Sequence, residues 1–293
     1  MKHTLQIDFY KDDQVDDQSI EKLTTFINQW NNVHKSQFVD VIGTGWNILL
    51  EKEKDAKELA HLLKEINHLK KEHDIVWEKY EDKLYEQSDF NNADWILLFG
   101  KGVPEEFFLN ERKAMSNPKK CLVCGSQRDN SREQIEPFII DENYLYKDQK
   151  GNIYQHSWDI VNSTYGLLVS KRVIEIFENY KVKGYILKEV ISKQTGTVSK
   201  VMFQLYAQKA IIVPCLEHTT ITGKGVCPSC GKYHGQIESE LFIRSEWIGD
   251  DEIFTTAPSK RDKFHFSNRI YHLLKSHKIN GIHPASIAFT CHK

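Results

Sequence analysis

Two Cys-x-x-Cys-Gly segments, more than a hundred residues apart, constrain this 293-residue chain more than any other feature. The segments are Cys121-Leu-Val-Cys124-Gly125 and Cys227-Pro-Ser-Cys230-Gly231. A turn of this kind offers two thiolates to one ion, and a tetrahedral structural zinc site needs four ligands. We therefore predict that the two segments close one zinc site between them. Such a site has no open coordination position, so the predicted zinc is structural and not catalytic.

A second ligand set is compatible with the same sequence. Cys215-Leu-Glu-His218 stands shortly before Cys227 and Cys230, and the four residues Cys215, His218, Cys227 and Cys230 would form a compact Cys3His site. His234, four residues after Cys230, is a further candidate ligand. The spacing alone leaves these alternatives to Cys121 and Cys124 open.

The second half of the chain contains an imperfect duplication. The segment Ser170-Lys-Arg172-Val173 corresponds to Ser267-Asn-Arg269-Ile270, and Gly184 corresponds to Gly281, at a constant offset of 97 residues. In each copy an apolar triplet typical of a strand precedes a Ser in N-cap position, and apolar residues then recur at helical spacing up to the Gly. We predict two related strand-helix-strand modules, placed about a pseudo-twofold axis that brings the two Cys-x-x-Cys turns together. The alternative is that two unrelated helices share common capping residues.

The first hundred residues predict a separate α+β region. Strand patterns cover residues 5–10 and 75–85, helical periodicity covers 20–30 and 54–71, and Gly43-Thr-Gly45 joins two further strands into a hairpin. The turn-forming segment Ser116-Asn-Pro118 leads into the first cysteine turn. The predicted fold class is α+β: an N-terminal α/β sandwich over residues 1–115, then a duplicated module pair over 116–293 joined by a zinc-ribbon-like pair of cysteine turns.

Composition limits the cellular setting. No window has the roughly 18 consecutive apolar residues that a membrane span needs, and the N-terminus lacks the apolar segment of a signal peptide. We therefore expect a cytoplasmic protein without membrane contacts. In a reducing compartment the six cysteines are more typical of metal ligands or free thiols than of disulfides.

The charge distribution supports one alternative function. The formal net charge is −2, but the segment from Pro258 to Lys293 carries about +6. A basic segment that also contains Phe264, Phe266 and Tyr271 is compatible with a zinc protein that binds nucleic acid. No Gly-x-Ser-x-Gly, His-Glu-x-x-His or phosphate-loop motif is present, so we expect no enzyme activity and name no catalytic residue.

The sequence resembles the bacterial double-CxxCG proteins in three features. These are the two cysteine turns, the segment Gly249-Asp-Asp-Glu-Ile-Phe254 after Trp247, and the Ser-x-Arg-Ile helix before Gly281. The segment from Tyr85 to Ala93 is similar to a region of that family ahead of the first turn. The resemblance implies an immunity protein of a polymorphic toxin system, which binds and neutralises a cognate toxin. It gives neither the toxin, nor the binding surface, nor the oligomeric state. The longer N-terminal region and the additional Cys215 and Cys291 depart from the family pattern.

Overall fold

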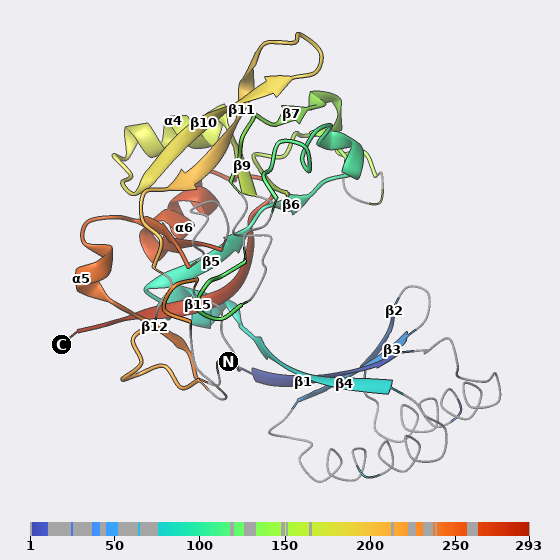
Figure 1. The fold of residues 1–293 in the computed structure, drawn as a ribbon, viewed down its shortest axis with the longest axis vertical. Coiled ribbons are helices and arrows are strands. Elements are labelled where there is room, and N and C mark those ends of the chain that lie inside the picture. The colour runs from blue at the N-terminus through green and yellow to red at the C-terminus, as the bar shows by residue number, and fades with distance from the viewer. Residues whose placement is uncertain are drawn as a thin grey trace. The chain divides into compact units, whose positions relative to one another are not determined.

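A computed structural model describes residues 2–10, 25, 37–41, 45–51, 64, 76–117, 120–125, 133–147, 150, 152–163, 166–211, 214–221, 227–230, 237, 239–256 and 263–292. The chain forms two compact units, Met1–Gln87 and Ser88–Lys293 (Figure 1). Each unit is described by itself.

The described strands of the N-terminal unit form one antiparallel sheet. Its strands are β1 (Lys2–Tyr10), β2 (Gln37–Val41), β3 (Gly45–Glu51) and β4 (Val76–Leu84). They pair in the order β2-β3-β1-β4, which confirms the predicted strands and the hairpin of β2 and β3. The two predicted helices lie outside the described residues, apart from Thr25 and Lys64, which are helical. The predicted sandwich therefore stays a prediction.

The C-terminal unit contains two sheets. The first sheet has the order β6-β8-β9-β11-β10-β7, with β6 (Lys101–Gly102), β7 (Ile139–Ile140), β8 (Ile160–Ser163), β9 (Gly166–Ser170), β10 (Tyr185–Ser192) and β11 (Val198–Ala207). The second has the order β12-β15-β5-β14-β13, with β5 (Trp95–Phe99), β12 (Leu241–Arg244), β13 (Ile253–Thr255), β14 (Phe264–Ser267) and β15 (His283–Cys291). Among the described residues from 87 on, the helices are α3 (Gln87–Asn92), α4 (Lys171–Asn179), α5 (Ser245–Ile248) and α6 (Asn268–Ser276), with 3-10 turns η1 (Glu105–Phe107) and η3 (Glu142–Tyr144).

The two sheets repeat one pairing pattern. In the first sheet β8-β9-β11-β10 is antiparallel and β7 then joins β10 in parallel. In the second sheet β13-β14-β5-β15 is antiparallel and β12 joins β15 in parallel. The predicted modules are thus present as β9-α4-β10 and β14-α6-β15, and the duplication extends to whole sheets.

The central strand of each sheet comes from the other repeat. In chain order β5 precedes the first module, yet it pairs with β14 and β15 of the second. Conversely β11 precedes the second module and pairs with β9 and β10 of the first. Figure 1 shows β5 beside β15, although they lie far apart along the chain. The two repeats are therefore interlocked by exchanged strands.

This exchange explains why the compact units divide after Gln87 and not near residue 115. Strand β5 is central in the second sheet, and its Trp95, Ile96 and Leu98 are buried. Removing an apolar central strand from a sheet would expose backbone hydrogen-bonding groups on both of its neighbours. Residues 95–99 consequently belong to the duplicated unit, upstream of the boundary that turn-forming residues predicted.

Both module helices begin and end in the same way. The side chains of Ser170 and Ser267 accept hydrogen bonds from the backbone N–H three residues later, as N-caps do. After each helix the chain passes through Gly184 (φ +95°) or Gly281 (φ +89°), a backbone region that favours glycine. The predicted caps and the positive φ of both glycines are confirmed, but each helix ends several residues earlier, where Lys181 (φ 54°) and Lys278 (φ 52°) already adopt positive φ.

Contacts across the pseudo-twofold axis are reciprocal. The Arg172 guanidinium donates to the backbone carbonyl of His277, and the Arg269 guanidinium donates to the backbone carbonyl of Tyr180. Arg269 and His277 are the equivalents of Arg172 and Tyr180 at the offset of 97 residues. The Tyr180 and His277 rings contact each other, with centroids 5.6 Å apart. A contact between equivalent positions is what a twofold arrangement produces on its axis.

Candidate metal centre

The structure brings the sulfur atoms of both cysteine turns together, as the sequence predicted. All four sulfurs, those of Cys121, Cys124, Cys227 and Cys230, lie within 4.8 Å of one another. The Cys121 and Cys227 sulfurs are 3.8 Å apart, and those of Cys124 and Cys230 are 3.5 Å apart. A tetrahedron with zinc–sulfur bonds of about 2.3 Å has sulfur–sulfur edges of about 3.8 Å. The four thiols therefore have the spacing of a four-coordinate metal site.

The first turn has the backbone geometry of a metal-binding knuckle. The N–H of Gly125 donates to the carbonyl of Cys121 at 2.8 Å, and Gly125 adopts φ +71°. Hydrogen bonds from the backbone N–H groups of Cys124 and Val123 lower the pKa of the Cys121 thiol. The turn thus favours the thiolate, which is the form that binds a metal.

The second turn supplies the more deeply placed pair of ligands. Cys227 is buried and the other three cysteines are half-buried, whereas the residues between the cysteines of both turns, Leu122-Val123 and Pro228-Ser229, are exposed. Gly231 and the candidate ligand His234 lie outside the described residues. The site is therefore shielded at Cys227 and close to solvent at the tips of both turns.

The alternative ligands lie elsewhere. Cys215 and His218 form a separate group with Glu217, in which the potential ligand atoms lie within 4.8 Å of one another. The structure thus pairs the two knuckles and leaves the Cys-x-x-His segment outside the four-sulfur group. The sequence could not decide this, because a Cys-x-x-His segment near the second knuckle is compatible with both arrangements.

The position of the four sulfurs defines what a bound ion would do. Cys121 and Cys124 stand before β7 of the first repeat, and Cys227 and Cys230 stand before β12 of the second. Four thiolates suit zinc, and all four positions of a tetrahedron would be filled by protein. A metal there would connect the two repeats and would have no position left for substrate.

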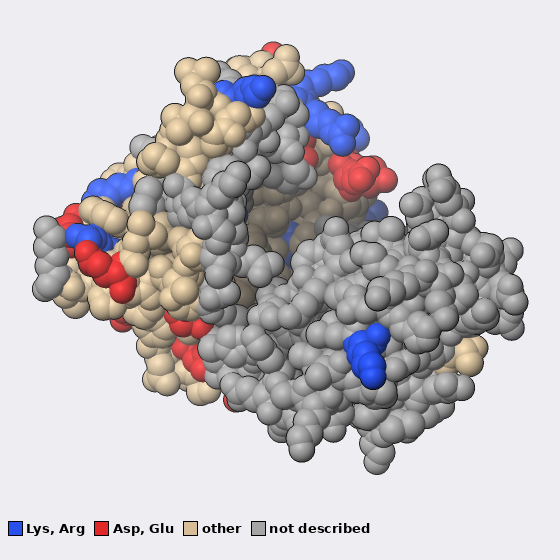
Figure 2. All heavy atoms as spheres, turned by 60° about the horizontal axis from the view of Figure 1, so that its bottom comes forward, with Lys and Arg blue, Asp and Glu red and all other residues tan. Residues whose placement is uncertain are grey.

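The aromatic residues of the basic segment are not available for stacking on bases. Phe264, Phe266 and Tyr271 are all buried. Arg269 is ion-paired with Glu252 at 2.6 Å. On the face shown in Figure 2, the described Lys and Arg side chains are interspersed with Asp and Glu.

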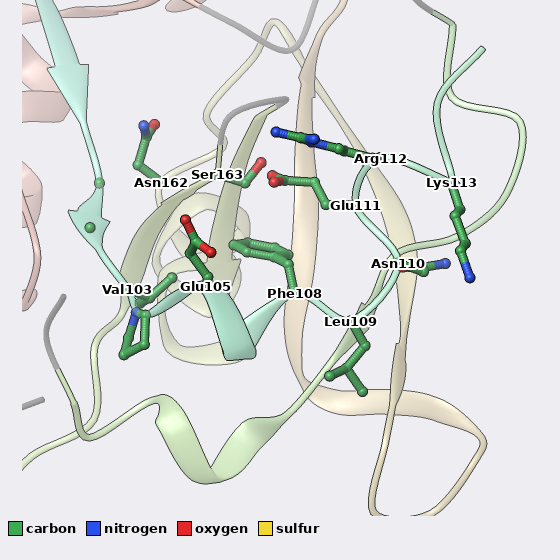
Figure 3. Close-up of a pocket in the computed structure, with 13 residues that line it drawn as sticks. Val103, Glu105, Phe108, Leu109, Asn110, Glu111, Arg112, Lys113, Asn162 and Ser163 are labelled. Carbon is green, nitrogen blue, oxygen red and sulfur yellow. The ribbon is translucent and has the colours of Figure 1, made fainter. Parts of the chain in front are cut away.

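A pocket in the first repeat gave no signal in the sequence. Its volume is about 840 Å³, and Figure 3 shows Phe108, Glu111, Arg112 and Ser163 among its lining side chains. The described lining contains charges of both signs but no histidine or cysteine. Those residues therefore form neither a nucleophile-histidine arrangement nor a cysteine site.

These features define a protein class: two interlocked repeats that share a closed four-cysteine centre. Comparisons with known proteins add no relative, since no family model matches the sequence and no curated protein shows significant similarity to it. Within the described residues, no helix has the length and apolar character required to span a membrane.

Proposed function

We propose that this protein is a non-catalytic, zinc-stabilised immunity protein that binds and neutralises a cognate bacterial toxin in the cytoplasm. The observation that carries the proposal is the convergence of both Cys-x-x-Cys turns on one four-sulfur cluster. It is the arrangement that the resemblance to the double-CxxCG proteins implies. Because a closed site leaves no position for substrate, binding is the better supported role for the unit around it.

The interlocked arrangement of the two repeats supports a binding role. The exchanged strands and the shared sulfur cluster both connect the two repeats. A surface held in one conformation before binding loses less conformational entropy when a partner docks. The metal would therefore contribute to affinity indirectly, by keeping the repeats in a fixed arrangement.

Coexpression tests the proposed function. Each toxin-like gene adjacent to the gene for this protein is induced in a bacterial host, with and without this protein, and surviving colonies are counted. Wild-type protein is expected to restore growth against one such toxin, and the purified pair should coelute in size-exclusion chromatography. Failure to rescue growth against any neighbouring toxin would contradict the proposal.

A matched variant separates the role of the metal. Cys124→Ser removes one of the four sulfurs from the cluster, whereas Ser229→Ala, at an exposed position of the second turn, leaves all four in place. We expect rescue to be weakened by Cys124→Ser and retained by Ser229→Ala at equal expression. Equal rescue by both variants would show that the four-sulfur centre does not support the immunity function.

Binding of nucleic acid is the second proposal, and the positive charge of the segment from Pro258 to Lys293 supports it. Its predicted stacking residues are buried, so any affinity would depend on phosphate contacts. It therefore predicts binding that falls steeply between low and moderate salt. An affinity that does not change with salt would refute it.

A further inference from the structure

The segment Cys215-Leu-Glu-His218 forms the same kind of turn as the first knuckle. The N–H of Thr219 donates to the carbonyl of Cys215 at 2.8 Å, just as the N–H of Gly125 donates to Cys121 at the same distance. In both turns the first and fourth residues are potential ligands. The turn at Cys215 differs in offering an imidazole where the knuckle offers a second thiol.

Three different donor atoms converge at this turn. The Cys215 sulfur, a Glu217 carboxylate oxygen and a His218 ring nitrogen lie within 4.8 Å of one another. Cys215 is fully buried, while Glu217 and His218 are exposed. The group therefore has a buried sulfur at its base and is open to ions from solvent.

Strand β12 holds the turn in place. The backbone N–H of Cys215 donates to the carbonyl of Phe242 at 2.8 Å, and the N–H of Phe242 donates to the Thr219 hydroxyl at 2.9 Å. The ring of His218 lies against that of Phe242, with centroids 5.5 Å apart. These contacts prearrange both ends of the turn without any metal.

Glu217 is oriented by a second residue of β12. One of its carboxylate oxygens accepts from Arg244 at 2.5 Å, and the other lies 3.7 Å from the Cys215 sulfur. A carboxylate held in this way at one oxygen can offer the other to an ion, as metal-binding carboxylates do in proteins. Arg244 would thus position Glu217, and its guanidinium also lies close to Cys215.

A fourth donor reaches the group from the neighbouring strand. Cys291 in β15 pairs with Arg244 of β12, and Cys215 is among the groups that surround its thiol. Cys291 is outside the group of mutually close ligand atoms, so it reaches the ion only through a rotation of its side chain. Its contribution is therefore expected to be smaller than that of Cys215.

We propose that Cys215, Glu217 and His218, with Cys291 as the fourth ligand, form a second binding site for a borderline transition-metal ion such as zinc. The donor set combines thiolate, imidazole and carboxylate, all of which are ligands of zinc in proteins. This second site lies entirely within the second repeat, whereas the four-cysteine centre joins the two repeats. It does not depend on the proposed immunity function.

Metal stoichiometry of the full chain tests the second site. Protein is equilibrated with zinc buffered at micromolar free concentration, and bound zinc is measured by native mass spectrometry. Wild type is expected to hold two zinc ions. His218→Ala and Cys215→Ser should each hold one, while Glu246→Gln, which alters another partner of Arg244, should still hold two.

Because His218 is exposed, His218→Ala is not expected to disturb folding, which circular dichroism verifies. Cobalt substitution adds an independent measure: the variant should lose part of the thiolate-to-cobalt absorption, and its affinity for the second ion should fall at least tenfold. One zinc ion in wild type, or two that persist in both His218→Ala and Cys215→Ser, would overturn the proposal.

Discussion

Replacing Gly281 with alanine tests the contact that interlocks the two repeats. Gly281 adopts φ +89°, and a Cβ built on it would lie 2.3 Å from the carbonyl oxygen of Ile160 in the other repeat. Gly184 makes the reciprocal approach, since its Cβ would lie 2.4 Å from the carbonyl oxygen of Ile253. Both equivalent positions therefore require a residue without a side chain.

The cost of the substitution has two parts. Positive φ costs an L-residue about 1–2 kcal/mol. The steric overlap adds about 1–3 kcal/mol, because a backbone carbonyl cannot avoid it by changing rotamer. Together they reduce the stability of the contact between repeats by about 2–5 kcal/mol, a large part of the 5–15 kcal/mol typical of a domain.

Gly196→Ala is the matched control. Gly196 also has positive φ, +67°, but no heavy atom lies within 4 Å of its built Cβ. Gly196→Ala should therefore lower the stability only by the cost of positive φ, about 1–2 kcal/mol.

Hydrogen exchange, followed by mass spectrometry on peptides from β8 and α6, measures the local free energy of opening in both variants. A loss in Gly281→Ala no greater than in Gly196→Ala would refute the argument.

Three further predictions concern stability. Asp159→Ala should lower the free energy of unfolding by about 2–3 kcal/mol in urea titrations, because the buried carboxylate accepts hydrogen bonds from Ser170 and Arg172. Burial lowers the pKa of His265 to about 4, so folding favours the neutral ring. The free energy of unfolding should therefore fall by up to about 3 kcal/mol as the pH decreases from about 6.5 to 4. Unfolding titrations of His265→Gln should show a smaller fall over the same pH range. A zinc chelator should lower the melting temperature of wild type more than that of Cys124→Ser, measured by calorimetry; equal shifts would contradict a role of the four-cysteine centre in stability.

The two modules could be predicted from the sequence because their signals are local. A Ser cap, apolar residues at helical spacing and a Gly suited to positive φ lie within about fifteen residues; both helices form with the expected caps, and the Gly occupies the turn beyond the helix end. The exchange of β5 and β11 could not be predicted in this way. An apolar run such as Trp95–Phe99 predicts a strand, but it does not indicate which of several distant strands will pair with it.

The candidate metal centre was predictable from the sequence only in part, for the same reason. The two Cys-x-x-Cys-Gly turns carry their chemistry in their spacing, and the four sulfurs do lie together. The separate placement of Cys215 and His218 depends on hydrogen bonds to Phe242 in β12, a contact that no local pattern encodes. The pocket beside Arg112 likewise combines residues between Gly100 and Lys113 with Asn162 and Ser163, which lie 50 and 51 positions after Arg112 in the chain.

The central claim is that one ion is shared by both cysteine turns, and zinc content measured on three variants tests it most directly. Cys124→Ser, Cys230→Ser and the double variant should each lose the same single zinc ion relative to wild type, as determined by native mass spectrometry. Retention of that ion in Cys124→Ser, or loss of two ions in the double variant against one in each single variant, would contradict the claim.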